Sequence, residues 1–244
     1  MNPPLLPRNV SRIEREEPFH FSCHPGIVCF TDCCRQLELA LTPYDVLRLK
    51  KACGIRSETF LDRYVIIEQE EDETFPRFYL SMVDDGRASC VFVADSGCTV
   101  YQNRPGACRA YPMGRAVIRQ ADNAMDDFFV LLQESHCHGF REQQGQDAAT
   151  YSKEQGLLIY NRFNDAMAVL LQHEQIRQGK QFAEQQREQF ILALYNLDQF
   201  RTLLFAGQIP GATTLDGTSR EGLADDEALL LYAIDWLKDI LFKS

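Results

Sequence analysis

The chain has 244 residues, of which 45% are hydrophobic and 25% charged, and its formal net charge is −10 at pH 7. These values are typical of a globular protein that is long enough to bury a hydrophobic core, in one domain or two small ones. The acidic balance excludes a uniformly basic face, so we do not expect nucleic acid as a partner.

The N-terminal residues 1–19 contain four prolines and alternating charges, which predict an extended, flexible tail. No continuous apolar stretch follows their arginines, so the segment is not typical of a signal peptide. Nowhere does an apolar run approach the roughly 20 residues that span a bilayer, and no membrane contact is expected. We therefore expect a cytoplasmic protein, in a compartment that keeps thiols reduced.

The segment after this tail, residues 20–145, predicts a cysteine-cluster domain with a few helices and strands. Thr42, Pro43 and Gly54 mark the ends of a helix over residues 42–54. A second short helix is expected to begin near Ser57.

Strands are expected in the second half of this domain. Residues 77–93 place two apolar runs around the sequence DDG, which predicts a β-hairpin. Residues 94–114 are rich in Gly, Pro and Cys and predict a loop. Further strands are expected at residues 115–119 and 128–132.

Residues 146–244 lack cysteine and have helical periodicity. Three helices are expected, around residues 157–171, 190–204 and 230–241, with residues 206–222 as a loop before the last. The whole chain therefore predicts an α+β fold that is mainly helical. We expect the helical C-terminal region to dock a protein partner.

The nine cysteines are the strongest chemical signal in the sequence. Cys53 stands apart on the first predicted helix and is interpreted as a small buried residue. The others follow the pattern Cys23-x5-Cys29-x3-Cys33-Cys34, Cys90-x7-Cys98-x9-Cys108 and Cys137. An odd count and a strained neighbouring pair argue against a disulfide framework. Metal ligation is favoured over disulfide or redox chemistry and over buried free thiols.

Four thiolates complete either a tetrahedral zinc site or a [4Fe–4S] cluster, and eight divide into two sets of four. The Cys-x2-Cys knuckles of structural zinc sites, the Cys-x2-Cys-x2-Cys run of bacterial ferredoxins and the Cys-x3-Cys-x2-Cys motif of radical enzymes are all absent. Iron–sulfur and zinc stay open, and the missing knuckles favour iron–sulfur. The pair Cys33 and Cys34 could serve one metal or two.

Arginines near the cysteines offer charge compensation. Eight thiolates with two zinc ions or two [4Fe–4S]²⁺ cores would keep a formal charge of about −4. Arg35 follows the vicinal pair, and Arg104 and Arg109 flank Cys108. We predict that these three arginines bind the cofactor by donating hydrogen bonds to sulfur. An anion-binding or plain surface role is the alternative.

Three histidines, His24, His136 and His138, lie beside expected ligands and could replace a thiolate, although a hydrogen-bonding role is favoured. Sequence motifs of nucleotide binding, zinc proteases and serine hydrolases are absent. Any enzymatic chemistry is therefore expected to be that of the metal centre.

The stretches FSCHPGIVCFTDCC, LTPYDVLRLK, GCTVYQNRPGACRAYP and HCHGF, in this order, resemble the YkgJ family of cysteine-cluster proteins, a zinc- or iron-chelating domain, over roughly residues 20–145. Cys23-x5-Cys29 is longer than the family's first gap. The resemblance implies these metal ligands: Cys23, Cys29, Cys33, Cys34, Cys90, Cys98, Cys108 and Cys137.

The favoured interpretation is a metal-binding protein that holds iron–sulfur clusters or zinc through about eight cysteines, with a structural or electron-transfer role. A protein-modifying or redox enzyme is one alternative, but eight cysteines would saturate two four-coordinate sites and leave no open position. A metal store, chaperone or sensor is the other, and the strong helical core argues against a pure buffer.

Overall fold

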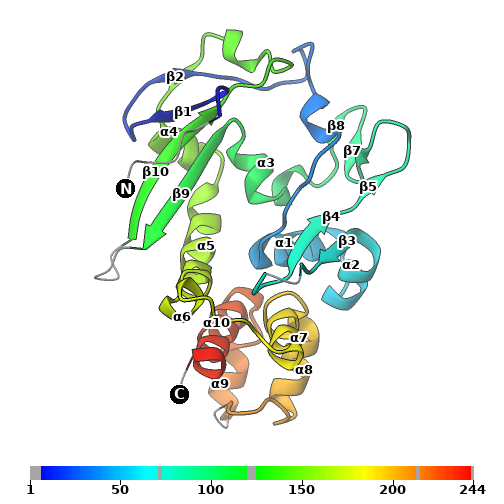
Figure 1. The fold of residues 1–244 in the computed structure, drawn as a ribbon. Helices are drawn as coiled ribbons and strands as arrows, with labels where there is room; N and C mark the ends of the chain where they lie inside the picture. Colours follow the sequence, from blue (N-terminus) through cyan, green and yellow to red (C-terminus); the bar gives the residue numbers. More distant parts are fainter. Residues whose placement is uncertain (1–6, 71–72, 120–124, 213–214, 243–244) are drawn as a thin grey trace. The chain divides into compact units, whose positions relative to one another are not determined.

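A computed structural model describes residues 7–70, 73–119, 125–212 and 215–242 (Figure 1). Contacts divide the chain into two units. Unit 1 consists of Met1–Leu37 and Met82–Asn161, and unit 2 of Glu38–Ser81 and Arg162–Ser244. This grouping differs from a division at residue 145, because Glu38–Ser81 makes its contacts with the C-terminal helices.

The largest sheet of unit 1 has three antiparallel strands in the order β1-β10-β9 (Figure 1). The strands expected at residues 115–119 and 128–132 are confirmed as parts of β9, Met113–Arg119, and β10, Met125–Leu132. The prediction that residues 1–19 form a flexible tail is wrong for Val10–Ile13. These four residues form β1 and pair with β10.

The reason that β1 forms lies in its apolar end. Ile13 pairs with Phe129, and both side chains are buried. The prolines that suggested a tail precede and follow this short strand, and they do not interrupt it.

The other elements of unit 1 are short. Three further two-stranded pairs form, β2 with β11, β5 with β6, and β7 with β8. The bounds are β2 Phe19–His20, η1 Asp32–Cys34, β5 Met82–Val83, β6 Ser89–Cys90, β7 Val93–Ala94, β8 Gly97–Cys98, η2 Tyr101–Asn103, α3 Gly106–Ala110, η3 Gly139–Arg141, β11 Gly145–Gln146 and α4 Ala148–Glu154.

A cluster of buried apolar residues supports these elements. Phe21 makes edge-to-face ring contacts with Tyr111, Phe140 and Tyr151. Ring pairs in this geometry stabilise a core beyond the area they bury. The cluster consists of Ile13, Phe19, Phe21, Met113, Phe129, Leu131, Ala148, Tyr151 and Leu157.

Unit 2 is mainly helical. α5, Leu157–Leu171, begins in unit 1 and ends in unit 2. The remaining elements are α1 Pro43–Cys53, α2 Ser57–Tyr64, β3 Val65–Glu68, β4 Arg77–Leu80, α6 Glu174–Arg177, α7 Glu184–Leu194, α8 Leu197–Phe205, α9 Gly217–Gly222 and α10 Asp226–Phe242.

The two helices predicted at residues 42–54 and near Ser57 are confirmed. Thr42 caps α1 in a reciprocal capping box with Asp45, and Gly54 ends it in the left-handed conformation. The helix expected at residues 190–204 is instead two helices, α7 and α8, and the expected loop at residues 206–222 contains α9.

The hairpin predicted for residues 77–93 is right only in its second part. Met82–Val83 pairs with Ser89–Cys90, whereas Arg77–Leu80 pairs with Val65–Glu68 of β3. The predicted α+β class, mainly helical, is confirmed. Within the described residues, no helix has the length and apolarity to cross a bilayer.

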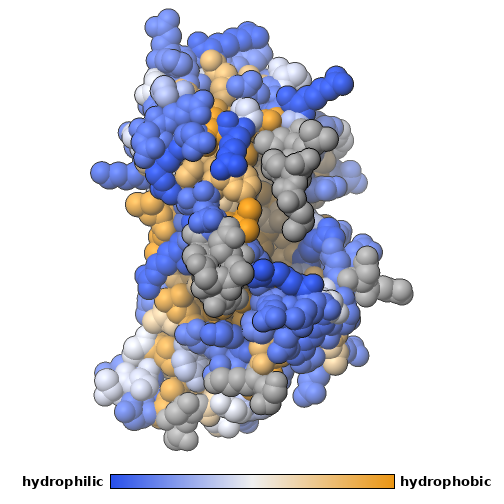
Figure 2. Space-filling model, turned by 60° about the vertical axis from the view of Figure 1, so that its left-hand side comes forward, coloured by the Kyte–Doolittle hydropathy of each residue, from blue (hydrophilic) through white to orange (hydrophobic). Residues whose placement is uncertain are grey.

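Hydrophilic side chains dominate the face of the molecule seen in Figure 2, and apolar ones appear between them in limited patches. This agrees with the charged, acidic composition.

Candidate metal centre

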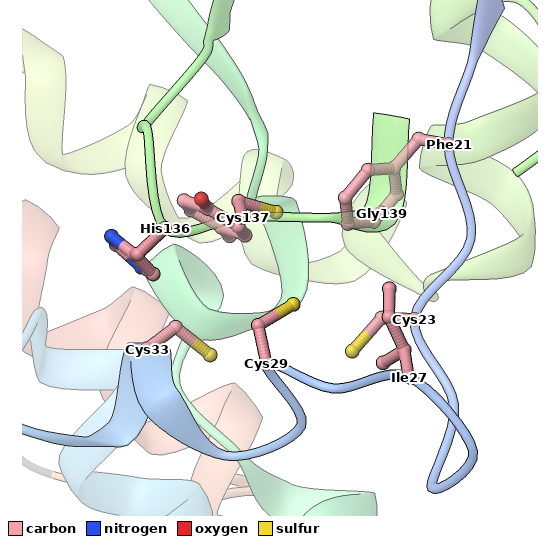
Figure 3. A pocket seen from close by; sticks show the side chains of 9 residues that line it. Phe21, Cys23, Ile27, Cys29, Cys33, His136, Cys137 and Gly139 are labelled. Atoms are coloured by element: carbon pink, nitrogen blue, oxygen red, sulfur yellow. The ribbon is translucent and has the colours of Figure 1, made fainter. Parts of the chain in front are cut away.

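Four cysteines line one small pocket in unit 1, with a cavity of about 20 Å³ (Figure 3). That is room for a body of about the size of one water molecule. Figure 3 shows the four sulfurs around a shared space. We call these residues the pocket set: Cys23, Cys29, Cys33 and Cys137.

Backbone pairing brings the first and last members of the pocket set together. The amide of Ser22 donates to the carbonyl of Gly139 at 3.1 Å, next to Cys23 and Cys137. A side chain at Gly139 would collide with the ring of Phe21 and the carbonyl of Ser22. Glycine is therefore required for this close approach.

A tight turn places the middle members. The amide of Asp32 donates to the carbonyl of Cys29 at 3.0 Å, and the 3₁₀ helix η1 then carries Cys33. The sulfur of Cys29 accepts a hydrogen bond from the amide of His138, with N···S at 3.1 Å. A backbone donor to sulfur stabilises a thiolate.

Of the remaining cysteines, Cys90 and Cys98 lie on two short strand pairs, Cys34 lies in η1, and Cys108 lies on α3. Arg35 pairs with Ser89 in an isolated antiparallel bridge. Cys34 precedes Arg35 and Cys90 follows Ser89, so the bridge places these two cysteines next to each other on the paired segments. Cys98 pairs with Val93, and the amide of Phe92 lies 3.5 Å from the sulfur of Cys90. We call these residues the hairpin set: Cys34, Cys90, Cys98 and Cys108.

The thiols differ in their readiness to ionise. Burial raises the pKa of Cys23 to about 11 and also raises the pKa of Cys90 and of Cys98. A hydrogen bond from Cys34 lowers the pKa of Cys33 to about 7, and the same contact raises the pKa of Cys34. Within this pair, one thiol is therefore favoured in the thiolate form that binds metals, and the other holds the proton that it shares.

Among the described residues, no three or more His, Cys, Asp or Glu side chains are already arranged to hold a metal ion. Metal binding therefore requires these thiols to turn toward common centres. The eight proposed ligands all belong to unit 1. Their soft sulfur donors are of the kind that zinc and iron–sulfur clusters take.

Two buried donors in this region also fit such a group. Within the described part of the chain, the Tyr111 hydroxyl and Arg35 Nε have no hydrogen-bond partner. Tyr111 lines the pocket, where burial and the nearby side chains of Cys137 and Glu134 raise its pKa, although neither side chain meets the geometry of a hydrogen bond with the hydroxyl. Buried polar atoms nearly always have partners, so an acceptor at this site is expected. A metal-bound sulfur is an acceptor of that kind.

Most of the donor nitrogens of the arginines that were predicted to bind the cofactor instead form hydrogen bonds with oxygen atoms of the protein. Arg104 donates to Tyr101 O and to Gln155 Oε1, both at 2.7 Å. Arg109 donates to the carbonyls of Arg104, Gln155 and Gln102. Arg35 donates through Nη1 to Thr31 O at 2.6 Å. Their contact with a cofactor stays a prediction.

The charge of Arg104 still acts on the thiols. It acts to lower the pKa of Cys23 and of Cys98, but the larger effect of burial keeps both pKa values raised. Compensation from this arginine therefore reaches members of both cysteine sets across space, without a hydrogen bond.

Of the three histidines, only His136 lines the pocket. Its Nε2 lies 3.7 Å from Glu134. His24 accepts a hydrogen bond from the amide of Gly26 through Nδ1, and His138 contributes its backbone amide. Cys53 belongs to unit 2 and is partly exposed, which corrects the interpretation as a buried residue.

The sequence analysis does not single out the hydroxyl of Tyr111 or the backbone amide of His138, which both lie next to proposed ligands. The burial of Tyr111 beside Cys137 depends on how residues far apart in the chain pack. A backbone amide leaves no sequence signal at all.

The family CxxCxxCC, described as "Putative zinc- or iron-chelating domain", matches residues 22–146. No curated protein and no solved structure matches the chain. The matched range agrees closely with the predicted cysteine-cluster segment 20–145, whereas the narrower naming as the YkgJ family stays a prediction. The chain has longer gaps, x5 and x3, before Cys33 and Cys34 than the family name spells out. The chain belongs to the CxxCxxCC family.

Proposed function

We propose that unit 1 is a metal-binding module in which eight cysteine thiolates hold iron–sulfur clusters or zinc, with a structural or electron-transfer role. The observation that carries the proposal is the meeting of the pocket set on one cavity. Its members come from two segments of the chain, and the contact of Cys29 with His138 joins positions 109 residues apart. Thiols that are gathered in this way are ligands that a soft metal prefers.

The supporting groups around the thiols agree with this assignment. Backbone amides point at the sulfurs of Cys29 and Cys90. The Tyr111 hydroxyl is a further buried donor on the pocket. Such outer donors tune the affinity and the potential of metal–thiolate centres.

Of the two alternatives, zinc and iron–sulfur clusters, we favour iron–sulfur clusters. The support is the lack of Cys-x2-Cys knuckles in this chain. An iron–sulfur cluster supplies one-electron chemistry, whereas zinc supplies a redox-inert cross-link.

The residues of this chain would position such a centre and shield it from water. Phe21 and Ile27 line the apolar part of the pocket. A dry surrounding is one of the factors that set the potential of such a centre.

The test is an absorption spectrum with elemental analysis of protein purified without oxygen. Iron with matching acid-labile sulfide supports an iron–sulfur centre. Zinc without sulfide supports a structural centre and overturns the preference for iron. A full-length protein that retains neither metal after reconstitution overturns the proposed function.

A further inference from the structure

We infer that the vicinal pair is divided between two separate four-thiolate sites, with Cys33 in the pocket set and Cys34 in the hairpin set. The inference rests on the proposed metal-binding function and adds which ligands share a metal. Each set then supplies the four thiolates that one zinc ion or one [4Fe–4S] cluster takes.

The pocket set is defined by its cavity. Cys33 lines the pocket together with Cys23, Cys29 and Cys137, whereas its neighbour Cys34 does not. In Figure 3 the sulfur of Cys33 faces the same space as the sulfurs of Cys23 and Cys29. The pocket therefore already holds four thiols without a contribution from Cys34.

The hairpin set is defined by backbone pairing. The Arg35–Ser89 bridge and the hydrogen bond from Gln36 N to Ala88 O, at 2.9 Å, align the chain after Cys34 with the strand that carries Cys90. The β7–β8 pair folds the chain back so that Cys98 lies opposite Val93. Cys34 and Cys90 are thus neighbours across one bridge, and Cys98 lies on the strand pair that follows Cys90 in the chain.

The fourth member, Cys108, lies on the short helix α3. No strand pair carries Cys108, and it joins the hairpin set because it does not line the cavity of the pocket set.

The local backbone makes a division of the pair possible. Cys33 and Cys34 lie in the 3₁₀ helix η1, where successive residues are rotated by about a third of a turn. Their side chains therefore leave the helix in different directions. The two thiols still contact each other, so the two sites would be neighbours.

Each set also has a buried donor close at hand. Tyr111 lines the cavity of the pocket set. Arg35, whose backbone pairs beside the hairpin set, has an Nε atom that is buried and has no partner within the described residues. We expect these two donors to serve sulfurs of different sites.

The test uses the full-length protein loaded with ¹¹³Cd²⁺, which takes thiolate sites of the zinc type and is observed directly by NMR. The inference predicts two cadmium resonances without cadmium–cadmium coupling, because no thiolate is shared. Cys137→Ser removes one resonance and Cys98→Ser removes the other, each lowering bound cadmium by about half. The double variant removes both, and Cys53→Ser keeps both.

Several results would overturn the division. They are a single resonance, coupled resonances, the loss of both signals in one single variant, or the loss of the same signal in Cys137→Ser and Cys98→Ser. If a variant does not fold, the number and coupling of the wild-type resonances decide alone. Failure of the wild-type chain to bind any cadmium, iron or zinc would instead contradict the proposed function itself.

Discussion

The backbone amide of His138 donates a hydrogen bond to the sulfur of Cys29 at 3.1 Å, although the two residues are 109 positions apart. The contact joins the first cysteine-rich segment of unit 1 to its last. It requires the chain to return after most of the matched family region, and it places the partial positive charge of an N–H group beside a proposed ligand.

Replacing Tyr111 by phenylalanine removes a buried hydroxyl that has no partner among the described residues. We expect metal-free Tyr111→Phe to be at least as stable as the wild type, because an unsatisfied buried group costs about 1–3 kcal/mol. Metal affinity should fall by roughly tenfold or more, as for other outer donors of metal sites. Thermal unfolding and competition with a chelator measure the two effects.

The matched control is Tyr151→Phe. The Tyr151 hydroxyl donates to the carbonyl of Tyr111 at 2.5 Å, so this variant should lose about 1 kcal/mol of stability with or without metal. Equal effects of both variants on metal-free stability would contradict a special role for the Tyr111 hydroxyl.

The Gly139→Ala variant should destabilise unit 1. The added Cβ would collide with the ring of Phe21 and lie 2.9 Å from the carbonyl of Ser22. We expect a loss of about 1–3 kcal/mol and a lower metal content, because the backbone next to Cys137 has to move. Hydrogen exchange of the residues around the pocket measures the local opening.

Gly222→Ala is the comparison for this change. A Cβ at Gly222 meets nothing within 4 Å, and the residue lies in the helix α9. Its substitution should leave metal content unchanged. A wild-type metal content in Gly139→Ala would show that the close approach of Ser22 and Gly139 does not position the ligands.

Lys50 is a buried cation in unit 2, and its Nζ lies 3.0 Å from carboxylate oxygens of both Asp198 and Asp226. Lys50→Met leaves two carboxylates without this partner and should cost about 3–5 kcal/mol. Urea unfolding followed by the fluorescence of Trp236, the single tryptophan, reports on unit 2. Lys51→Met changes an exposed neighbour and should have little effect.

The same cluster makes the stability of unit 2 depend on pH. Burial acts to raise the pKa of Asp198 and of Asp226, but hydrogen bonds and nearby cations hold both below the ordinary value of 3.8. A carboxyl with a lowered pKa in the folded state stabilises it above the unfolded pKa. That stability is lost as the pH falls through the folded pKa.

We therefore expect the free energy of unfolding of unit 2 to change little from pH 7 to about pH 5 because of these groups, and to fall below about pH 4. Asp198→Asn should be less stable at pH 7 and have a shallower acid dependence. Parallel acid curves for the wild type and Asp198→Asn would contradict the assignment.

The sequence predicted those parts of the fold that have local signals. Thr42, Pro43 and Gly54 mark the ends of α1 because capping depends on residues next to each other. The strand at Val10–Ile13 was missed because it is held by pairing with β10, more than a hundred residues later. The break between α7 and α8 at Tyr195–Asn196 carries neither glycine nor proline, so periodicity alone joined the two helices.

The candidate site was likewise predictable only where its signals are local. The choice of eight cysteines follows from their types and spacing, whereas their grouping depends on pairings such as Arg35 with Ser89. The arginines were predicted as sulfur donors from their position next to Cys108. In the structure, Arg104 donates to the carbonyl of Tyr101 and Arg109 to the carbonyls of Gln102 and Gln155, which no sequence pattern indicated.

The central claim is that the clustered thiols of unit 1 bind metal and that Cys53 does not. The most direct test is the metal content of anaerobically purified Cys29→Ser and Cys108→Ser beside Cys53→Ser and the wild type. We predict that the first two variants lose about half or more of the bound metal and unfold more readily, because metal binding and folding are coupled. Cys53→Ser should keep the wild-type content. Loss of metal in Cys53→Ser, or full retention in both Cys29→Ser and Cys108→Ser, would contradict the ligand set.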